Sequence, residues 1–512
     1  MPRSQERFST EPSHSSSDHI FVKLQRASGV LLPLTSLPGR FGIGDLGESA
    51  RNFADLLAEV NQGVWCILPF GPPGPFNSPY QSCSAFAGSP LLLSPVELVS
   101  AGYLSKKELN DAPKFPRNRV DYVAVTKYKN AMLRRAFQAF SETAEYLSFE
   151  EKNSWWLQPY LNFMALLKAN NGRPWNRFDP SRKPSEKTAR FHGFLQFEFF
   201  RQWSKFRAHC RSRDIRILGD LPFYVEYNSA DVWSNPTLFD LDSKNEMRTV
   251  GGVPPDYFSH DGQRWGSPTY RWGRIAEQGY RWWIDRFRFA FEHLDLLRVD
   301  HFRGFEAYWS VPAKDKTARN GRWIAGPGAA LFDAVKKELG DAAIVAENLG
   351  VISPEVEALR AQFGFPGLAV LQFGFGSDPV HYPENYTEDT VAFTGTHDNN
   401  TINGWWSDLR ASAKAPRNTG AREALLRAEK LFRSRGARIH WQATQTVLNS
   451  KASLAIFPLQ DVLGLEGASR MNFPGKQRGN WTWRIEARQL KASELRRLRV
   501  LTESSGRAEA ST

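Results

Sequence analysis

Short hydrophobic runs, each bounded by glycine, proline or a charged residue, recur along the whole chain. This pattern is typical of parallel strands that are buried on both faces. Eight such runs lie at residues 30–34, 64–70, 215–225, 294–300, 343–349, 368–373, 391–398 and 454–462. Segments with helical spacing, such as 48–60 and 328–339, lie between them. Eight strands that alternate with helices predict an α/β fold, a closed (β/α)8 TIM barrel.

The spacing of the runs is uneven. About 145 residues separate the second run from the third, far more than one crossover helix needs. Aromatic-rich helical patterns at 126–146 and 191–211 predict a mostly helical insertion at about 75–210, after strand 2. A second excess at about 226–279, after strand 3, is rich in Pro, Gly, Trp and Tyr. We expect it to form a long ordered loop region over the barrel mouth.

The two ends differ from the rest in composition. We expect residues 1–20 to form a disordered polar leader, 21–500 a single barrel domain and 501–512 a flexible tail. The leader is rich in serine but contains Glu6, Glu11 and Asp18, which disfavours a transit peptide. We find no linker between domains and no internal repeat.

The charge balance does not change this picture. The 512 residues include 66 Lys and Arg against 54 Asp and Glu, a net charge of +12, but the basic clusters are short and separated by acids. They indicate solvated helix faces and no nucleic-acid partner. The 3 cysteines suggest neither a disulfide framework nor a zinc site. Without a signal segment or a run of about 18 apolar residues, we expect a cytoplasmic protein with no membrane partner.

Aromatic residues make up 13% of the chain, including 17 Trp and 36 Phe. Most rings are ordinary core material. Several stand beside Gly, Pro and Asn in predicted loops, as in the stretches 77–80 and 264–268, where packing explains them less well. Rings on loops indicate a stacking surface.

Three predicted strands end in an acidic residue: Asp300, Glu347 and Asp398. A barrel brings the carboxyl ends of its strands to one rim, so the three acids surround one cavity. Arg298 and Asp300 are two residues apart and share a strand face. A cation at that position favours the ionised form of Asp300, as a carboxylate nucleophile requires. The alternative is a buried ion pair that merely closes the barrel.

Glu347 follows three apolar residues and has no basic neighbour in sequence. An apolar setting raises the pKa of a carboxylic acid and suits it to donate a proton, although Glu347 could instead cap the next helix. One ionised and one protonated carboxyl are the arrangement for glycoside cleavage. At a separation of about 5 to 5.5 Å the ionised group attacks the anomeric carbon and configuration is retained.

His397 and Asp398 are then candidates for binding sugar hydroxyls and a distorted ring. Metal binding is the competing interpretation of the His397, Asp398 and Asn399 run, since carboxylates and amides ligate hard cations. No further ligands stand at a fixed spacing, so no metal is predicted.

Longer motifs also stand along the chain. They are Asn77-Ser78-Pro79-Tyr80-Gln81-Ser82, Ser84-Ala85-Phe86-Ala87-Gly88, Gly219-Asp220-Leu221-Pro222, Gly252-Val253-Pro254-Pro255-Asp256-Tyr257-Phe258, Leu297-Arg298-Val299-Asp300-His301-Phe302-Arg303-Gly304, Ala346-Glu347-Asn348-Leu349-Gly350 and Gly479-Asn480-Trp481. With these motifs, the chain resembles the 4-α-glucanotransferases called amylomaltases or disproportionating enzymes, which are relatives of the α-amylases. The resemblance runs from about Gly29 to Arg484.

The resemblance implies that Asp300 is the nucleophile, Glu347 the general acid/base and Asp398 the transition-state stabiliser. It implies that the substrate is bound by Tyr80, Asp220, Asp256, Arg298, His301, His397 and Asn480, with Gln263 and Trp265 on a flexible loop that closes over the glucan. It also implies no organic cofactor. Two positions depart from the family pattern: Ser89 replaces an Asn and Asn400 replaces an Asp.

The preferred hypothesis is a transferase that moves α-1,4-glucan segments between maltooligosaccharides or starch- and glycogen-derived glucans, by a retaining double displacement through a covalent glycosyl-enzyme on Asp300. A loop that excludes water and rings that hold an acceptor favour transfer over hydrolysis. The alternatives are an α-amylase-like retaining hydrolase and a non-catalytic glucan-binding protein. No obligate protein partner is evident.

Overall fold

The computed structural model describes residues 24–255, 259–432 and 438–508. Eight parallel strands close a barrel in the order β1-β12-β11-β10-β9-β6-β3-β2. They are β1 Ala27–Leu31, β2 Val64–Cys66, β3 Arg216–Leu221, β6 Leu296–Val299, β9 Ile344–Ala346, β10 Gly367–Val370, β11 Thr390–Phe393 and β12 Leu454–Pro458. Each strand lies within or next to one of the eight hydrophobic runs, so the predicted (β/α)8 barrel is confirmed.

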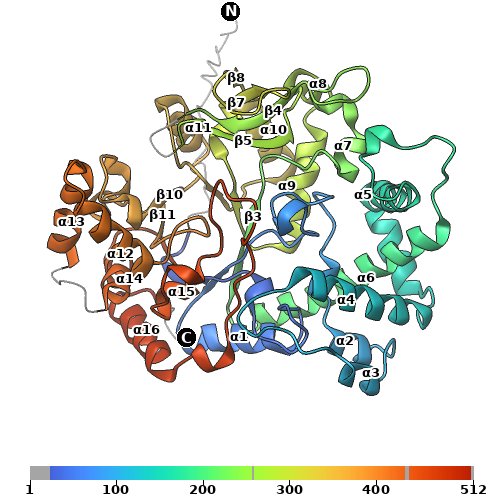
Figure 1. Cartoon of the computed structure of the whole chain (residues 1–512), viewed down its shortest axis with the longest axis horizontal. Coiled ribbons are helices and arrows are strands. Elements are labelled where there is room, and N and C mark those ends of the chain that lie inside the picture. The colour runs from blue at the N-terminus through green and yellow to red at the C-terminus, as the bar shows by residue number, and fades with distance from the viewer. Residues whose placement is uncertain (1–23, 256–258, 433–437, 509–512) are drawn as a thin grey trace, which may run out of the picture.

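Helices cover the outside of the barrel and form its additions (Figure 1). They are α1 Glu48–Glu59, α2 Pro95–Ser100, α3 Lys106–Asn110, α4 Tyr122–Gln138, α5 Ala144–Ala169, α6 Glu186–Arg211, α7 Ala230–Ser234, α8 Trp272–Glu277, α9 Arg281–His293, α10 Ala329–Leu339, α11 Pro354–Gln362, α12 Ile402–Ala413, α13 Thr419–Phe432, α14 Ile439–Asn449, α15 Leu459–Val462 and α16 Ala492–Ser504. In the described part of the chain, no helix combines the length and the apolar composition that crossing a membrane requires.

Alternating side chains divide each barrel strand between two cores. Val64 and Cys66 belong to the cluster that fills the barrel, whereas Trp65 between them packs outward with the helices. On β6, Leu296 belongs to the inner cluster and Leu297 to the outer one. Because side chains repeat every two residues, Arg298 follows Leu296 into the barrel.

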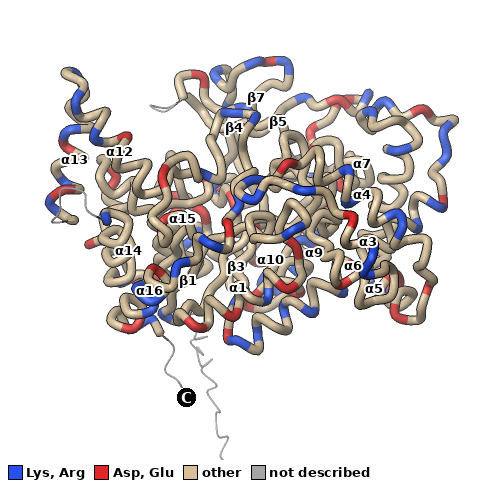
Figure 2. The backbone as a smooth tube through the Cα atoms, turned by 60° about the horizontal axis from the view of Figure 1, so that its bottom comes forward, with Lys and Arg blue, Asp and Glu red and all other residues tan. Residues whose placement is uncertain are grey.

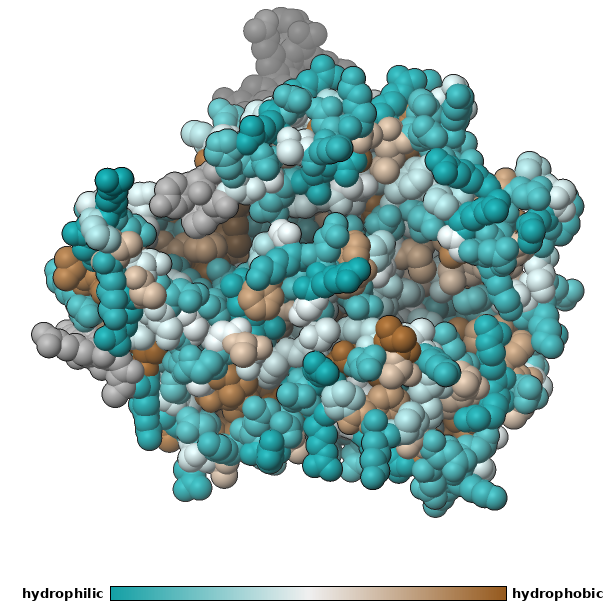
Figure 3. All heavy atoms as spheres, in the orientation of Figure 1, coloured by the Kyte–Doolittle hydropathy of each residue, from teal (hydrophilic) through white to brown (hydrophobic). Residues whose placement is uncertain are grey.

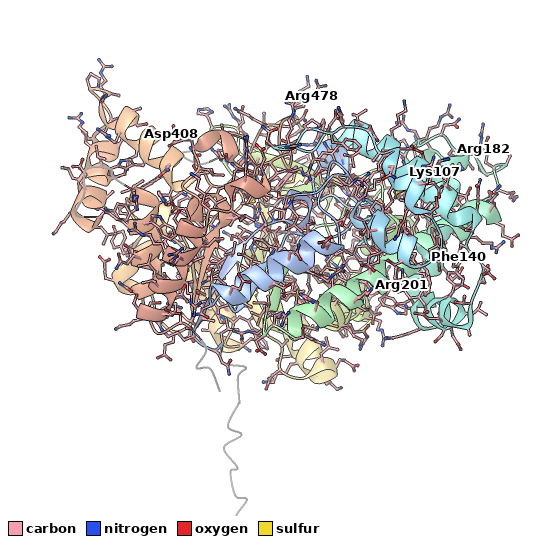
Figure 4. The ribbon with its side chains drawn as sticks, turned by 90° about the horizontal axis from the view of Figure 1, so that it is seen from below. Lys107, Phe140, Arg182, Arg201, Asp408 and Arg478 are labelled. Atoms are coloured by element: carbon pink, nitrogen blue, oxygen red, sulfur yellow. The ribbon has the colours of Figure 1, made fainter. Side chains whose placement is uncertain are left out.

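The insertion after strand 2 is mostly helical, as predicted, and comprises α2 to α6. Figure 4 shows it on one side of the barrel, where Lys107, Phe140 and Arg201 are labelled, with Asp408 of α12 on the opposite side. The expected helix at 126–146 is divided: α4 ends at Gln138, and α5 begins at Ala144 after the N-cap Thr143, whose hydroxyl accepts the backbone N–H of Tyr146. A capping residue inside a continuous apolar pattern produces this break.

The stretch after strand 3 contains more regular structure than a loop. Its strands β4 Thr249–Val253 and β5 Gln263–Pro268 join β7 Ala307–Pro312 and β8 Arg322–Ala325 in an antiparallel sheet of order β5-β4-β7-β8. The hydrophobic pattern did not predict this sheet, because its strands come from two distant stretches of chain. We call it the rim sheet; Figure 1 shows it beyond the barrel, near α8 and α10.

The prediction of a flexible tail at 501–512 is wrong for residues 501–507. Helix α16 continues to Ser504, and Arg507 is only 1% exposed. The Arg507 guanidinium donates to five carbonyl oxygens at the amino end of the barrel, those of Ala27, Leu448, Ser450, Ala452 and Ser453. The expected leader at 1–20 and residues 509–512 lie outside the described residues.

Candidate active site

Arg298 is the centre of a charged cluster at the carboxyl ends of three adjacent strands. Its Nη1 donates to Asp220 Oδ2 at 2.6 Å, and its Nη2 lies 3.1 Å from Asp300 Oδ1 and 3.9 Å from Glu347 Oε2. Asp220 belongs to β3, Asp300 follows β6 and Glu347 follows β9. The structure therefore brings together two of the three acids that the strand pattern placed on one rim, Asp300 and Glu347, and adds Asp220, around an Arg298 side chain that is 9% exposed.

Glu347 is held by the backbone as well. Its carboxylate accepts the N–H of His301 at 2.7 Å and that of Leu349 at 2.9 Å. His301 adopts a left-handed conformation, with φ 51°, directly after Asp300. Such a conformation is costly for a residue other than glycine, and here it belongs to the turn that aims the His301 N–H at Glu347.

The electrostatics of the cluster follow from burial and a shortage of positive charge. Burial raises the pKa of Asp300 to about 8 and that of Glu347 to about 7, while Arg298 opposes both shifts. The sequence pattern did not predict that Glu347 shares Arg298 with Asp300. Because the two carboxyls interact, these pKa values belong to the pair, and the pair retains one proton near neutral pH.

Tyr80 and His397 extend the cluster. The Tyr80 hydroxyl donates to Asp220 Oδ2 at 2.8 Å and lies 3.0 Å from His397 Nε2. The two rings stack at 5.1 Å between centroids, and burial lowers the pKa of His397. A neutral imidazole beside a phenol and a carboxylate presents hydrogen-bonding groups without adding another full charge.

Asp398 stands at the open side of the cluster. Its side chain is 48% exposed, and Oδ1 lies 3.4 Å from His397 Nε2. Asn472 Nδ2 donates to the same Oδ1 at 2.6 Å, and Arg470 Nη2 donates to the Asp398 carbonyl at 2.8 Å. Sequence reasoning missed Asn472 and Arg470, which lie on a loop more than 70 residues away; the only signal was their closeness to the motif at 479–481.

In the same loop, the side chain of Asn480 bonds to the backbone. Its side-chain oxygen accepts the N–H of Phe473 at 3.0 Å, and its Nδ2 donates to the Lys476 carbonyl at 2.6 Å. Both amide atoms therefore close the loop that carries Asn472. In Figure 4, Arg478 of this loop projects outward between the insertion and α12. Contact between Asn480 and substrate stays a prediction.

The rim sheet reaches the cluster through Trp265. Its ring meets the edge of His301 at 4.9 Å between centroids, and its Nε1 donates to Gln263 Oε1 at 3.2 Å. Gln263 and Trp265 therefore lie beside the strand ends, on β5. Asp256 lies outside the described residues.

A pocket that is lined in part by Tyr80 and Asp220 borders the cluster. Figure 3 shows recessed apolar areas on the face seen in Figure 1. Basic and acidic residues are interspersed over the backbone in Figure 2 and form no single basic stripe. Within the described ranges, no group of three His, Cys, Asp or Glu is arranged to hold a metal ion.

The two departures from the family pattern have local partners. Ser89 caps a short 3-10 turn, since its hydroxyl accepts the N–H of Leu91. Asn400 Nδ2 donates to Asp408 Oδ2 at 2.8 Å. An aspartate at position 400 would place a second carboxylate against Asp408, so asparagine suits this neighbour.

Comparison with known proteins agrees with this geometry. A family model described as 4-alpha-glucanotransferase matches residues 32–490. The chain is 43% identical to the 4-alpha-glucanotransferase of Thermus thermophilus, over 95% of this chain and 100% of that one, and 45% identical to that of Synechocystis, over 94% and 98%. Its structure resembles an amylomaltase from Streptococcus agalactiae solved with acarbose, with a TM-score of 0.89, 33% identity and coverage of 95% and 100%. The chain is an enzyme of the 4-alpha-glucanotransferase family.

Proposed function

We propose that this enzyme transfers α-1,4-glucan segments between maltooligosaccharides, or between glucans derived from starch or glycogen, by a retaining double displacement. The observation that carries the proposal is the position of Arg298, whose guanidinium contacts the carboxylates of Asp300 and Glu347 at the ends of neighbouring strands. Asp300 is the nucleophile and Glu347 the general acid/base. The ligand of the Streptococcus agalactiae relative, acarbose, is consistent with a glucan site.

In the first step a carboxylate oxygen of Asp300 attacks the anomeric carbon of the donor. The glycosidic C–O bond breaks, and the leaving oxygen takes the proton of Glu347. The two carboxyls share one proton, and in the reactive form it stands on Glu347, because Arg298 lies closer to Asp300, at 3.1 Å, than to Glu347, at 3.9 Å, and favours the ionised form of its nearer neighbour.

In the second step Glu347 removes the proton from the 4-hydroxyl of an acceptor glucan. The acceptor oxygen attacks the anomeric carbon, and the ester bond to Asp300 breaks, which restores both carboxyl groups. Two inversions at one carbon retain its configuration. Asp398, oriented by Asn472, stabilises the positive charge that develops on the sugar ring in both steps.

Tyr80, Asp220, Arg298, His301 and His397 surround the reacting sugar in this proposal, and the family resemblance adds Asp256 and Asn480 as substrate-binding residues. Gln263 and Trp265 on β5 form part of the cover that excludes water from the glycosyl-enzyme. Transfer prevails over hydrolysis because a stacked acceptor is held in place while water is kept out.

The product profile of maltotriose tests this function. Transfer predicts glucose together with oligomers longer than maltotriose. Release of reducing ends without elongation would identify a hydrolase instead. Activity that is the same in wild type and Asp300→Asn would exclude the proposed nucleophile, and binding without any reaction would identify a glucan-binding protein.

A further inference from the structure

The loop between β11 and α12 carries His397 and Asp398, and it is fastened at both ends by one side chain. Asp461 Oδ2 accepts the hydroxyl of Thr394 at 2.7 Å, and Asp461 Oδ1 accepts the backbone N–H of Ile402 at 2.7 Å. Thr394 is the first residue after β11, and Ile402 is the first residue of α12. A single carboxylate therefore spans the start and the end of the segment 394–402.

Asp461 is itself fixed by the barrel. It lies in the short helix α15, directly after β12, which pairs with β11 through Phe393 and Ile456. Asp461 is only 1% exposed. The ends of the loop are thus tied to the neighbouring barrel strand, while its middle is held by Arg470 through the Asp398 carbonyl.

The surroundings of Asp461 are unusual for a buried carboxylate. Burial raises its pKa to about 7, and the groups that oppose this shift are the Ile402 N–H and the Thr394 hydroxyl, with no cation contributing. Burying a carboxyl group without a countercharge is costly, so a stability role alone gives no reason to prefer it over an apolar residue.

The rest of the loop is closed by internal contacts. The Asn399 side chain accepts the N–H and the hydroxyl of Thr396, each at 2.8 Å, and the Thr396 hydroxyl accepts the N–H of Asp398 at 3.3 Å. These bonds shape the turn but do not place it over the barrel. Asp461 ties both ends of the turn to the barrel.

We propose that Asp461 is a positioning residue for the transfer reaction, which holds His397 and Asp398 in register with Asp300 by hydrogen bonding to both ends of their loop. The proposal rests on the role of Asp398 in the proposed function. A displacement of about 1 Å in a catalytic group can cost about a hundredfold in rate, so fastening this loop serves catalysis directly.

Two variants of Asp461 separate the hydrogen bonds from the charge. In Asp461→Asn, the amide oxygen accepts the Ile402 N–H and the amide nitrogen donates to the Thr394 hydroxyl, so both bonds persist. We expect kcat for maltotriose within about threefold of wild type. Asp461→Leu loses both bonds, and we expect kcat to fall at least about tenfold with KM within about twofold, as for an interaction made in the transition state.

Asp295→Leu is the matched control. Asp295 is another largely buried carboxylate that accepts a strand N–H, that of Ile217. It also pairs with Arg207 and Arg211, and it lies at the amino end of β6, away from the site. Its loss lowers thermal stability while kcat of the folded enzyme stays unchanged. Thr394→Val, which removes one of the two bonds, replaces Asp461→Leu if that variant does not fold, and we expect an intermediate loss of kcat.

Hydrogen exchange separates a failure of this inference from a failure of the proposed function. Amides of 394–402 exchange faster in Asp461→Leu or Thr394→Val and remain protected in Asp461→Asn, whether or not the wild type transfers glucan. A folded Asp461→Leu variant with wild-type kcat and unchanged exchange would overturn the inference. A loss of kcat in Asp461→Asn equal to that in Asp461→Leu would also overturn it, because the charge would then be what matters.

Discussion

At the scale of single residues, the active site is a problem of charge balance. One guanidinium, that of Arg298, serves Asp220, Asp300 and Glu347. Burial removes the solvent that would otherwise stabilise the carboxylates, so the site favours a bound proton. The proposed chemistry uses that proton. The same buried charges make the folded protein less stable than it would be with neutral side chains at these positions.

The pH dependence of catalysis follows from this balance. Burial raises the pKa of Glu347 from the ordinary value of 4.5 to about 7. Activity needs the proton on Glu347, so we expect the basic limb of the kcat profile near pH 7 or above. The acidic limb reports the uptake of a second proton by the Asp300–Glu347 pair. A basic limb near pH 4.5 would contradict the account, and a Glu347→Gln variant serves as the control because it lacks this limb.

The pH dependence of protein stability provides an independent test of the raised pKa of Asp300. The folded-state pKa of Asp300 is raised, so its ionisation destabilises the fold as pH rises above the unfolded value. Asp300→Asn removes that charge, and we expect it to raise the melting temperature at pH 8.5 by about 1–3 °C, with a smaller gain at pH 5. Calorimetry measures both values. A melting temperature that falls equally at both pH values would contradict the raised pKa.

Sequence reasoning predicted the strand-end acids because strand ends and acidic residues are local features. It missed Asp461 and Asn472, since a buried carboxylate and a half-buried amide look ordinary until the fold places them beside the loop at 394–402. Sequence reasoning also missed the cation beside Glu347, because Arg298 lies on another strand.

At the scale of elements, helix α6 has two structural roles. It is the crossover helix that leads from β2 to β3, and its Trp203 and Phe206 pack outside the barrel, where Phe206 meets Trp65 at 5.4 Å between centroids. It also forms a wall of the insertion against α5. The aromatic-rich helical pattern predicted residues 191–211 of this helix, whose middle, 193–200, is buried on all sides.

The rim sheet was harder to predict. Its strands are short, and their partners come from the segments after β3 and after β6, so no local pattern reveals the pairing. The arrangement attaches β5, which carries Gln263 and Trp265, to the segment that follows the nucleophile strand. We infer that the rim sheet fixes the position of Gln263 and Trp265 relative to Asp300.

Removal of the Trp265 ring tests the role of this cover. We expect Trp265→Ala to raise the ratio of hydrolysis to transfer severalfold, because water then reaches the glycosyl-enzyme more often. The measurement is glucose equivalents released against oligomers elongated from maltotriose. Trp155→Ala, at a 47% exposed ring on α5, is the control and leaves the ratio unchanged. An unchanged ratio in Trp265→Ala would contradict the proposed cover.

At the scale of the whole molecule, the two ends of the barrel serve different purposes. The carboxyl end carries the charged cluster, and the amino end is closed by Arg507, which donates to five carbonyl oxygens. The polar composition of the last residues suggested a flexible tail, since the partners of Arg507 are backbone atoms and leave no trace in the sequence.

Arg507→Ala tests the stabilising role of this closure. Buried carbonyls lose their donors, so we expect unfolding free energy to fall by about 2–4 kcal/mol, measured by denaturant titration. The kcat of the folded enzyme stays unchanged because the active site lies at the other end. Arg499→Ala, at a 55% exposed side chain on α16, is the control with little effect. Equal stability of the two variants would contradict this role.

The whole mechanism depends on the covalent step through Asp300, and trapping the glycosyl-enzyme shows whether that step occurs. In a Glu347→Gln variant given a maltooligosaccharyl fluoride, the leaving group needs no acid, so the first step proceeds while the second lacks its base. Mass spectrometry then detects an adduct equal to the transferred glucan, and peptide mapping places it on Asp300. An active wild type whose Glu347→Gln variant forms no adduct, or forms one at another residue, would contradict the account.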